Sequence, residues 1–520
     1  MVDVAAPQVA TPVRQPLFSD GYKRAVLATL TLCYTLNFID RTIIGIIGQP
    51  MKESLGMTDA QLGLLGGLGF ALLYTLLGVP IARIAERVSR VNVMAVCITV
   101  WSGFTALCGL APNFAAMFAM RIGVGIGEAG CSPPAHSLIS DYYEPKRRAS
   151  ALSVYAFGIP LGGMLGAVLG GLIAQYLNWR MAFFVVGLPG VLVALALKLI
   201  VKEPPRGHSE IEARPALPED VTPEEAPAPA RSFVQEMRHE VRELGAVAWR
   251  IFGTWSFLNM ALGVTLASFA GYGAGQFASP YFIRAFGLGL ALVGGLFGVI
   301  GGFSSGAGTL VGGFVTDWLS KRSAAWYALV PGIGLMLAVP IYLVAYTRLD
   351  WRVAAWILLL PGIFQYTYLG PTFGVIQNAV DQRRRATATA VLFLFLNLIA
   401  LGGGPAFTGW LIDQFGQFNF THAGSHSIMS SLSRIFLHGE AVGGQFADLC
   451  PGGLPRKGVA TTLTAACKPT LVRATREGLI VVFFFYAWGG LHYFLAALTL
   501  AKDLRKAAAE RGDAVGAPAR

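Results

Sequence analysis

Four charged residues stand inside long apolar stretches of this sequence, where a charge is unfavourable without a partner. Asp40 and Arg41 are the only charged residues in the stretch 25–51. Arg121 and Glu128 lie in another apolar stretch, about two helical turns apart and so on nearly one helix face. A charge at the centre of a membrane helix costs roughly 2.5–3.5 kcal/mol on insertion scales. We therefore expect these residues to face one another or a wet cavity.

Ion pairing and proton transfer are the chemistry that these four residues could perform. Counted at about 1.5 Å per residue from one membrane surface, Asp40 lies at a depth of ~18 Å, and Arg121 and Glu128 lie at ~12 and ~22 Å. The four charges can thus share one layer, with pairs between the first and fourth helices. A buried carboxylate that loses its arginine partner takes up a proton. We expect Asp40 and Glu128 to carry the proton and Arg41 and Arg121 to bind an anion and to set when the proton leaves. The alternative is a purely structural ion-pair cluster.

The composition indicates the elements that must position these residues. Of the 520 residues, 54% are hydrophobic and 13% are charged, against roughly 25% charged in soluble domains. The sequence predicts an all-α, multi-pass membrane protein. Twelve apolar stretches are long enough to span a bilayer: 24–48, 61–82, 91–111, 114–139, 150–176, 180–201, 252–283, 288–316, 325–346, 352–379, 386–412 and 478–501.

The basic residues gather in alternate loops, which predicts the orientation of the chain. By the rule that such loops stay inside, both termini are cytoplasmic, and we expect a bacterial inner (plasma) membrane protein. The net charge of +11 follows from these loops, so it does not indicate nucleic-acid binding. The loop bases are Arg83, Arg87, Arg90, Lys146, Arg147, Arg148, Lys321, Arg322, Arg383, Arg384 and Arg385.

The stretches and the segments between them predict five regions. We expect a cytoplasmic tail, a six-helix bundle, a cytoplasmic linker, a second six-helix bundle and a cytoplasmic tail, at 1–23, 24–201, 202–250, 251–501 and 502–520. Apolar residues recur at helical spacing over 232–249, which fits an amphipathic helix on the membrane surface or an extension of the seventh span.

The second bundle contains a long loop, 413–477, that we place in the periplasm. It shows no sustained periodicity, so we expect little ordered structure there. Cys450 and Cys467 both lie in this loop, where an oxidising compartment permits a disulfide; the alternative is two free thiols. The other four cysteines lie in apolar stretches, and we expect them to be small core residues.

The two halves of the sequence repeat. Glu86 lies four residues after Ala82 and four before Arg90. Asp317 has the same spacing from Gly313 and Lys321 in the second half. A second echo pairs Arg147-Arg148-Ala149-Ser150-Ala151 with Arg384-Arg385-Ala386-Thr387-Ala388.

This pattern resembles the major facilitator superfamily (MFS), whose signature after the second span is Gly-x-x-x-Asp-Arg-x-Gly-Arg-Arg. The first copy departs from it at Ala82, Glu86 and Ser89, and the second has Trp318 in place of the Arg. The resemblance implies twelve helices in two pseudo-symmetric six-helix bundles that rock about a central site. It also implies a cytoplasmic gate; the alternative is that the loop charges only fix topology. The gate residues would be Glu86, Arg87, Arg90, Asp317, Arg148 and Arg385.

Two short motifs are similar to the Spinster-like branch of that superfamily: Phe38-Ile39-Asp40-Arg41 and Gly125-Ile-Gly127-Glu128-Ala129. The resemblance implies proton-driven export of lysolipids or phosphorylated sphingoid lipids. The glycine and proline residues of 158–171 resemble a motif of antiporter members, although close helix packing explains them equally.

An anion of this kind needs a cavity with charge on one wall and an apolar or aromatic surface on the other. Tyr34 and Asn37 lie on the helix face of Arg41, and the second half adds aromatic and polar residues. The alternative for each aromatic residue is ordinary helix packing. The expected cavity residues are Tyr34, Asn37, Tyr281, Tyr366, Thr367 and Asn397.

Other kinds of function find little support. Gly125-x-Gly127-x-x-Gly130 matches a dinucleotide fingerprint but lies mid-membrane with no preceding strand. We expect no enzyme activity, cofactor or metal.

The sequence therefore predicts a proton-coupled secondary transporter of an amphipathic anion such as a lysolipid, working as a monomer in membrane lipid by alternating access. The alternatives are an MFS carrier of small organic anions or drugs, and a membrane receptor or scaffold that binds lipid without transporting it.

Overall fold

The structure is a computed structural model that describes residues 17–206, 208–209, 233–380, 384–422, 424, 427–439, 445–456 and 465–510. All regular structure in these residues is helical. Twelve helices or broken helices are long and apolar enough to cross a membrane, which confirms the all-α prediction. Residues 1–16 and 511–520 of the predicted tails, and residues 207 and 210–232 of the predicted linker, lie outside the described residues.

The first half contains six spans. Three are continuous helices and three are broken in two, at Gly67, at 129–131 and at Phe157. In chain order the elements are α1 (Asp20–Leu55), α2 (Asp59–Gly66) with α3 (Leu68–Arg87), α4 (Arg90–Cys108), α5 (Phe114–Glu128) with α6 (Ser132–Tyr142), α7 (Pro145–Ala156) with α8 (Gly158–Tyr176), and α9 (Trp179–Ile200).

The second half repeats this plan. Its fourth and fifth spans are interrupted by a short 3-10 turn, η1, and by a π-helical turn, η3. The elements are α12 (Trp255–Phe286), α13 (Leu290–Ser320), α14 (Trp326–Tyr346), α15 (Trp351–Gln365) with η1 (Tyr366–Tyr368) and α16 (Leu369–Asn378), α17 (Arg385–Phe395) with η3 (Leu396–Leu401) and α18 (Gly402–Thr421), and α22 (Cys467–Ala497).

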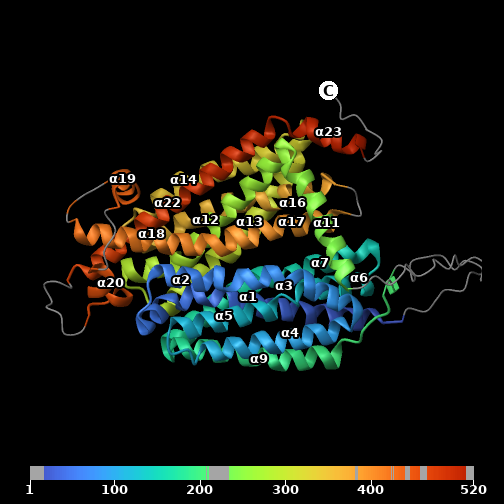
Figure 1. Ribbon diagram of the computed structural model, residues 1–520, viewed down its shortest axis with the longest axis horizontal. Helices are drawn as coiled ribbons and strands as arrows, with labels where there is room; N and C mark the ends of the chain where they lie inside the picture. Colours follow the sequence, from blue (N-terminus) through green and yellow to red (C-terminus); the bar gives the residue numbers. More distant parts are fainter. Residues whose placement is uncertain are drawn as a thin grey trace, which may run out of the picture.

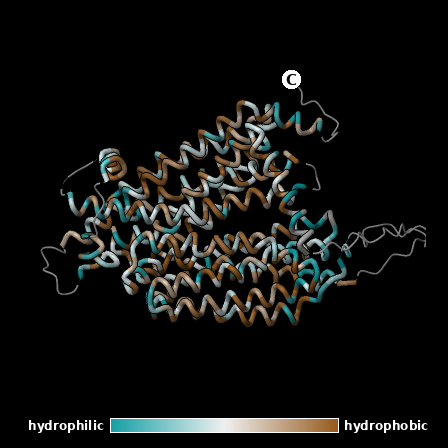
Figure 2. The backbone as a smooth tube through the Cα atoms, in the orientation of Figure 1, coloured by the Kyte–Doolittle hydropathy of each residue, from teal (hydrophilic) through white to brown (hydrophobic). Residues whose placement is uncertain are grey.

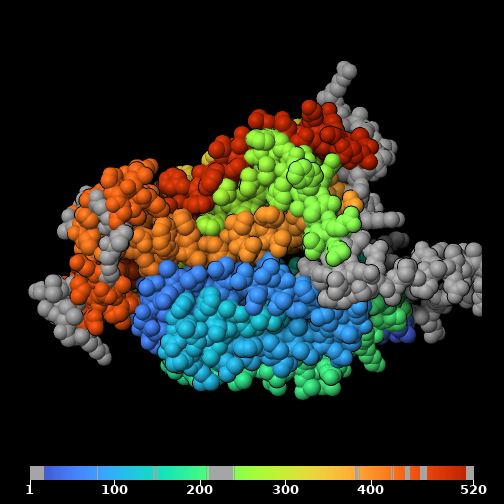
Figure 3. Space-filling view, viewed as in Figure 1, coloured from blue at the N-terminus to red at the C-terminus, as the bar shows by residue number. Residues whose placement is uncertain are grey.

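The two halves lie side by side as two bundles (Figure 1). We call the end where α1, α12 and α18 finish the loop end, and the end where α1 and α12 begin the linker end. The helices of the two halves converge at the loop end, on the left of Figure 1, and diverge towards the linker end. Helix α18 packs on α2, α13 packs on α8, and α1 packs on α12, so the two bundles contact each other through several helix pairs. The space-filling view shows the first half meeting the orange segment of the second (Figure 3).

The outer faces of the helices are apolar, as contact with lipid requires. On α9, Leu188, Leu192, Leu195 and Leu199 recur at helical spacing and are 55–74% exposed. The hydropathy view shows apolar colours along the spans and polar colours at the two ends of the bundles (Figure 2).

The segment between the bundles contributes a separate helix, α11 (Phe233–Phe252), which packs on α17 and α12. Gly253 ends it, and α12 begins anew at Trp255. A simple extension of the seventh span is thus wrong. After the last span, α23 (Leu500–Glu510) packs on α16.

The loop predicted at 413–477 is shorter and more helical than expected. Helix α18 continues to Thr421, and α22 begins at Cys467. Charged residues do not stop α22, because Arg473 and Glu477 form an i,i+4 ion pair along it. Three short elements lie between α18 and α22: α19 (Ile428–His438), α20 (Gln445–Leu449) and η4 (Pro451–Gly453).

Candidate functional site

Asp40 and Arg121 form a buried ion pair that joins α1 to α5. Arg121 Nη1 lies 3.1 Å from Asp40 Oδ1, and both residues are only 1% exposed. The other carboxylate oxygen of Asp40 accepts a hydrogen bond from the Thr105 hydroxyl on α4. Both oxygens of Asp40 are thus held by the first half itself.

Arg41 and Glu128 form the second pair of the same layer. Arg41 Nε donates to Glu128 Oε2 at 2.8 Å. The guanidinium also lies 4.6 Å from the ring centroids of both Phe70 and Tyr74 and 5.1 Å from that of Phe38. Aromatic faces attract a cation at such distances. Arg41 is therefore held between one carboxylate and three rings.

The two pairs differ in exposure. The side chain of Arg41 is 20% exposed, whereas that of Glu128 is fully buried. Glu128 Oε1 has no hydrogen-bond partner among the described residues. A buried polar atom without a partner is unfavourable by about 1–3 kcal/mol. This oxygen could take up a proton without disturbing the hydrogen bond between Arg41 and Glu128 Oε2.

Residues of the second half complete the surroundings of Arg41. Tyr272 on α12 is 43% exposed and close enough to Arg41 and Tyr74 to interact electrostatically. Tyr366 in turn lies close to Tyr272. Arg41 thus sits where an anion could contact both halves at once.

The local sequence explains how Glu128 is presented. It is the last residue of α5, and Pro133 and Pro134 at the start of α6 cannot donate the hydrogen bonds that would continue the helix. Gly125 lets α5 approach α3, because a Cβ there would lie 2.5 Å from the Phe70 carbonyl oxygen. Packing therefore accounts for the fingerprint-like glycines.

The glycine-rich fifth span has a packing role as well. A Cβ on Gly162 would lie 2.4 Å from the Thr35 carbonyl oxygen. Helix α8 can therefore pack closely on α1 one turn from Asp40. This contact explains the motif without reference to transport direction.

The predicted cavity residues are in different surroundings. Tyr34 stacks on Tyr155 at 4.4 Å, and Asn37 is 1% exposed with its Oδ1 unpartnered among the described residues. Tyr366 lies by Tyr272, and the half-buried Asn397 lies in the π-helical turn η3, which packs on α3 and α12.

Two predicted cavity residues do not reach the central layer. Thr367 is 4% exposed and donates to the Phe364 carbonyl oxygen at 2.8 Å. Tyr281 lies near the loop end, where its hydroxyl donates to the Tyr346 carbonyl oxygen at 3.2 Å. The sequence showed that both are polar in apolar spans, but not which way each helix turns them.

A second charged cluster closes the loop end, and the sequence did not predict it. Asp59 on α2 pairs with Arg284 on α12 at 2.6 Å and with Lys52 on α1 at 2.6 Å. All three are at most 4% exposed. Asp413 on α18 accepts from the backbone N–H groups of Asp59 and Ala60 at 3.0 and 2.7 Å. We call Lys52, Asp59, Arg284 and Asp413 the loop-end lock.

The lock crosses from one bundle to the other. Arg284 also donates to Gln49 at 2.6 Å and to Thr475 at 2.8 Å. Removing one partner of a buried ion pair destabilises the folded protein by about 3–5 kcal/mol. The single charges near span ends were the only sequence signal, and such charges are ordinary at a membrane surface.

The residues predicted to form a gate lie at the linker end. Arg90 binds Glu203 at 2.6 Å and also Asp141, all within the first half. Glu86 pairs with Arg83 at 2.5 Å. Among the described residues, no ion pair joins Glu86 or Arg90 to Asp317 or Arg385.

Other predicted gate residues lie at the same end. Arg148 donates to the Ser140 carbonyl oxygen at 3.0 Å, Arg87 is exposed on the last turn of α3, and the exposed Asp317 lies on α13. The gate remains a prediction for a conformation closed at the linker end.

Glu203 lies outside the spans and has a lowered pKa. Burial raises its pKa, but hydrogen bonds from Arg90, the Val91 N–H and the Ser89 hydroxyl outweigh burial and lower it overall. Glu203 is thus held as a carboxylate against the buried Arg90.

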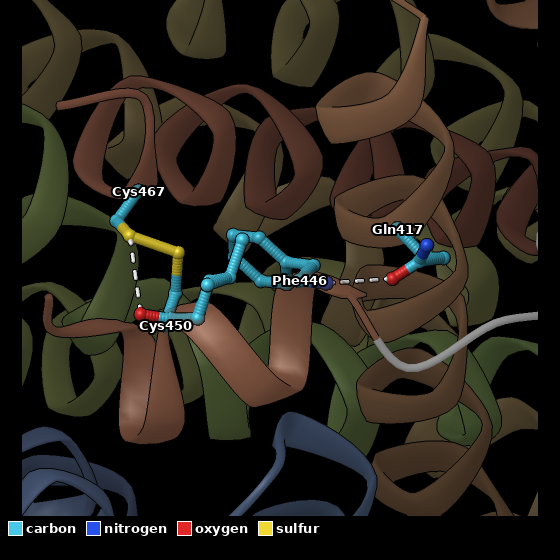
Figure 4. Close-up of a disulfide and its surroundings, with 5 residues drawn as sticks. Gln417, Phe446, Cys450 and Cys467 are labelled. Carbon is cyan, nitrogen blue, oxygen red and sulfur yellow. Dashed lines mark hydrogen bonds between the residues drawn. A yellow bond between two sulfur atoms is a disulfide. The ribbon is translucent and has the colours of Figure 1, made fainter. Parts of the chain in front are cut away.

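A disulfide ties the segment after α18 to α22. Cys450 and Cys467 are bonded, and the Phe446 N–H donates to Gln417 on α18 at 2.9 Å (Figure 4). The turn η4 follows Cys450 and packs on α1, where a Cβ on Gly452 would lie 3.0 Å from the Lys52 carbonyl oxygen. This segment of the second half therefore contacts the first half beside the lock.

Comparison with known proteins matches this architecture. A model of the Major Facilitator Superfamily matches residues 30–405. The chain is 31% identical over 390 residues to an MFS-type efflux pump of Mycolicibacterium smegmatis, covering 75% of this chain and 84% of that protein. It is 25% identical to the hexuronate transporter of Bacillus subtilis, covering 79% and 94%.

Spinster proteins are also similar. The chain is 27% identical to protein spinster of Drosophila melanogaster, covering 78% of this chain and 64% of that protein. The crystal structure of a bacterial homologue of the human lysosomal transporter Spinster, in an inward-facing and occupied conformation, superposes with a TM-score of 0.76. That homologue is 33% identical, and the match covers 94% of this chain and 99% of that one.

Proposed function

Because the chain belongs to the Major Facilitator Superfamily, we propose that it is a proton-coupled secondary transporter of an amphipathic anion, with a lysolipid as the leading substrate. One observation carries the proposal. The partly exposed Arg41 is paired with a fully buried Glu128 whose second oxygen has no partner among the described residues. An anion that takes Arg41 leaves Glu128 without its counter-ion, and Glu128 then takes up a proton.

The coupling follows from the energetics of buried charge. A lone carboxylate in a water-poor site is strongly disfavoured, and protonation removes its charge. Anion binding at Arg41 and proton binding at Glu128 therefore favour one another, and by linkage each raises the affinity for the other. The proton and a singly charged anion then cross together as a neutral pair, so an inward proton gradient drives uptake of the anion, which differs from the export that the resemblance implies. Asp40 and Arg121 neutralise each other throughout this cycle. Asp40 is the second candidate proton carrier.

The surroundings of Arg41 suit an anion with an apolar part. A guanidinium binds a phosphate or carboxylate through paired N–H groups. The rings of Phe38, Phe70 and Tyr74 flank Arg41, and Tyr272 presents a partly exposed ring from the other half. Similarity to protein spinster and to a sphingosine-1-phosphate transporter of Xenopus tropicalis favours a lipid.

We further propose the orientation and conformation. The basic loops favour a cytoplasmic linker end and cytoplasmic termini, and the loop end would then face the periplasm of a bacterial inner membrane. With the lock formed, this conformation is inward-facing. Opening the lock and closing the predicted gate at Glu86, Arg90, Asp317 and Arg385 gives the outward-facing state of alternating access. The site is complete within one chain, which favours a monomer.

A carrier of small organic anions is the second candidate, favoured by similarity to the hexuronate transporter. A transport screen separates the two. Purified protein in liposomes is given a proton gradient and either a radiolabelled lysophospholipid or glucuronate. Lysolipid flux that needs the gradient supports the proposal. Glucuronate flux without competition by lysolipid favours the second candidate, and binding without any flux favours a receptor.

A further inference from the structure

A cationic pocket lies at the loop end of the second half, away from the central layer. Its volume is about 420 Å³, and it lies between the end of α12 and the first turns of α22. Four of its seven lining residues are cations and none is an acid. The four are Arg284, Lys468, Arg473 and Arg476.

Two of these charges have no acidic partner. Arg284 is neutralised by Asp59, and Arg473 by Glu477 at 2.8 Å. In the part of the chain that the structure describes, neither the exposed Lys468 nor the half-buried Arg476 takes part in an ion pair. The pocket therefore holds an excess of two positive charges.

Arg284 is the wall that the pocket shares with the loop-end lock. A guanidinium has five N–H donors. In this conformation Nε binds Gln49, Nη1 binds Asp59 and Thr475, and Nη2 binds Asp59. One Nη2 hydrogen is left for a further acceptor.

Opening the loop end moves Asp59, on α2 of the first half, away from Arg284. Arg284, which is 4% exposed in this conformation, then loses the counter-ion that balances its charge. Lys468 and Arg476 already attract an anion to the same place. Such an anion can take over the contacts that Asp59 gives up.

We propose that this pocket binds a phosphate group, which replaces Asp59 as the partner of Arg284 and stabilises the conformation open at the loop end. Arginine forks and a lysine suit a phosphate, and Ala285, Pro469 and Val472 border them with apolar surface. The phosphate belongs to free inorganic phosphate or to a lipid headgroup. The inference rests on alternating access but not on the chemistry of Arg41 and Glu128.

The conformational effect follows from differential affinity. In the closed state the phosphate competes with Asp59 for Arg284, and in the open state it does not. A ligand shifts an equilibrium only by the difference of its affinities for the two states. Phosphate should therefore raise the ratio of open to closed molecules by about fivefold or more, the usual lower range of such coupling.

Spin labels on the two halves measure this ratio. Ser54 and Thr347 are exposed residues of the first and second halves at the loop end. The variants Ser54→Cys and Thr347→Cys are labelled in a Cys97→Ala background, and the distance distribution is recorded in nanodiscs of neutral lipid. One arm adds inorganic phosphate, one replaces part of the lipid by phosphatidylglycerol, and a third adds chloride at equal ionic strength.

Phosphate or phosphatidylglycerol should increase the long-distance fraction, and chloride should not. The arm that responds identifies the source. The double variant Lys468→Gln with Arg476→Gln should abolish the response. The matched control, Arg505→Gln with Lys506→Gln on α23, removes the same charges at the other end and should keep it. Thermal unfolding of each variant checks that it is folded.

Two results would overturn the inference. One is a wild-type distribution that neither phosphate arm changes, although a proton gradient or substrate still changes it. The other is an undiminished response in the folded Lys468→Gln, Arg476→Gln variant. A distribution that no condition changes would instead contradict alternating access, and with it the proposed function.

Discussion

Arg41 on α1 donates to Glu128 on α5 at 2.8 Å, and not to its own neighbour Asp40. Asp40 is held by Arg121 and Thr105. Of the two acids, Glu128 thus depends on the partly exposed arginine, and Asp40 does not. Substitutions of Glu128 and of Asp40 should therefore affect anion binding differently.

Replacing Glu128 should remove the coupling between anion and proton. In Glu128→Gln the side chain is neutral at every pH, so anion affinity should no longer rise as the pH falls. Binding of lysophosphatidylglycerol, whose phosphodiester keeps one negative charge throughout, is measured by calorimetry at mildly acidic and mildly alkaline pH to check this. Glu510→Gln is the matched control, because Glu510 pairs with Arg250 on the exposed surface. A steep pH dependence that survives in Glu128→Gln contradicts the assignment.

Arg41→Lys keeps the charge but loses the planar fork and its stacking on Phe70 and Tyr74. We expect the affinity for the anion to fall by about tenfold or more. The same assay in Arg41→Lys and Arg41→Gln measures the change. Equal affinity in wild type and Arg41→Lys would show that the anion does not use the guanidinium.

Breaking the loop-end lock should open that end of the molecule. Arg284→Gln leaves Asp59 with Lys52 alone, and losing one partner of a buried pair is worth about 3–5 kcal/mol. The label pair at Ser54 and Thr347 should shift towards longer distances. Arg352→Gln makes the same change at an exposed residue of the loop end and should leave the distribution unchanged; a shift as large as that of Arg284→Gln would refute a specific lock.

The disulfide should stabilise the segment that packs beside the lock. Cys450 and Cys467 are separated by 17 residues, and closing a loop of about this size is worth roughly 3 kcal/mol in the chain-entropy model. Cys450→Ser with Cys467→Ser should lower the unfolding temperature and widen the distance distribution at the loop end. Cys97→Ala should do neither. An unchanged distribution would mean that η4 does not help hold the two halves together.

Glu203 predicts a pH dependence of stability at the linker end. Its pKa is lowered in the folded protein from its ordinary value of 4.5. Its contribution to stability is therefore full above that value and is lost as the pH falls through the lowered pKa. Glu203→Gln should destabilise the protein at neutral pH and less so in acid. Thermal unfolding across this range tests the sign, and an equal loss at all pH values would contradict it.

Isolated charges in apolar stretches were sufficient to predict the central layer. Asp40, Arg41, Arg121 and Glu128 had to face one another or a wet cavity, since an isolated charge within the membrane is unfavourable. Which arginine pairs with which acid was not predictable, because it depends on how α1 and α5 are rotated against each other. The same uncertainty placed Tyr281 in the central cavity, whereas it lies near the loop end.

The loop-end lock could not be predicted for a different reason. Lys52, Asp59 and Arg284 lie near the ends of apolar stretches, where charges are ordinary and need no partner. Only the convergence of α1, α2 and α12 buries them. The sequence did not predict the early start of α22, because the first turns of this helix contain charged residues. Arg473 and Glu477 can pair only when the segment is helical, so the pair could not be recognised before the helix was known.

The most direct test of the central claim is the proton taken up when the anion binds. Purified protein in a weakly buffered solution is mixed with saturating lysophosphatidylglycerol, whose phosphodiester does not titrate in this pH range, and the pH change is recorded with an indicator dye. Coupling through Arg41 and Glu128 predicts an uptake of about one proton per anion in wild type and none in Glu128→Gln. Binding without proton uptake in wild type, or an equal uptake in Glu128→Gln, would contradict the account.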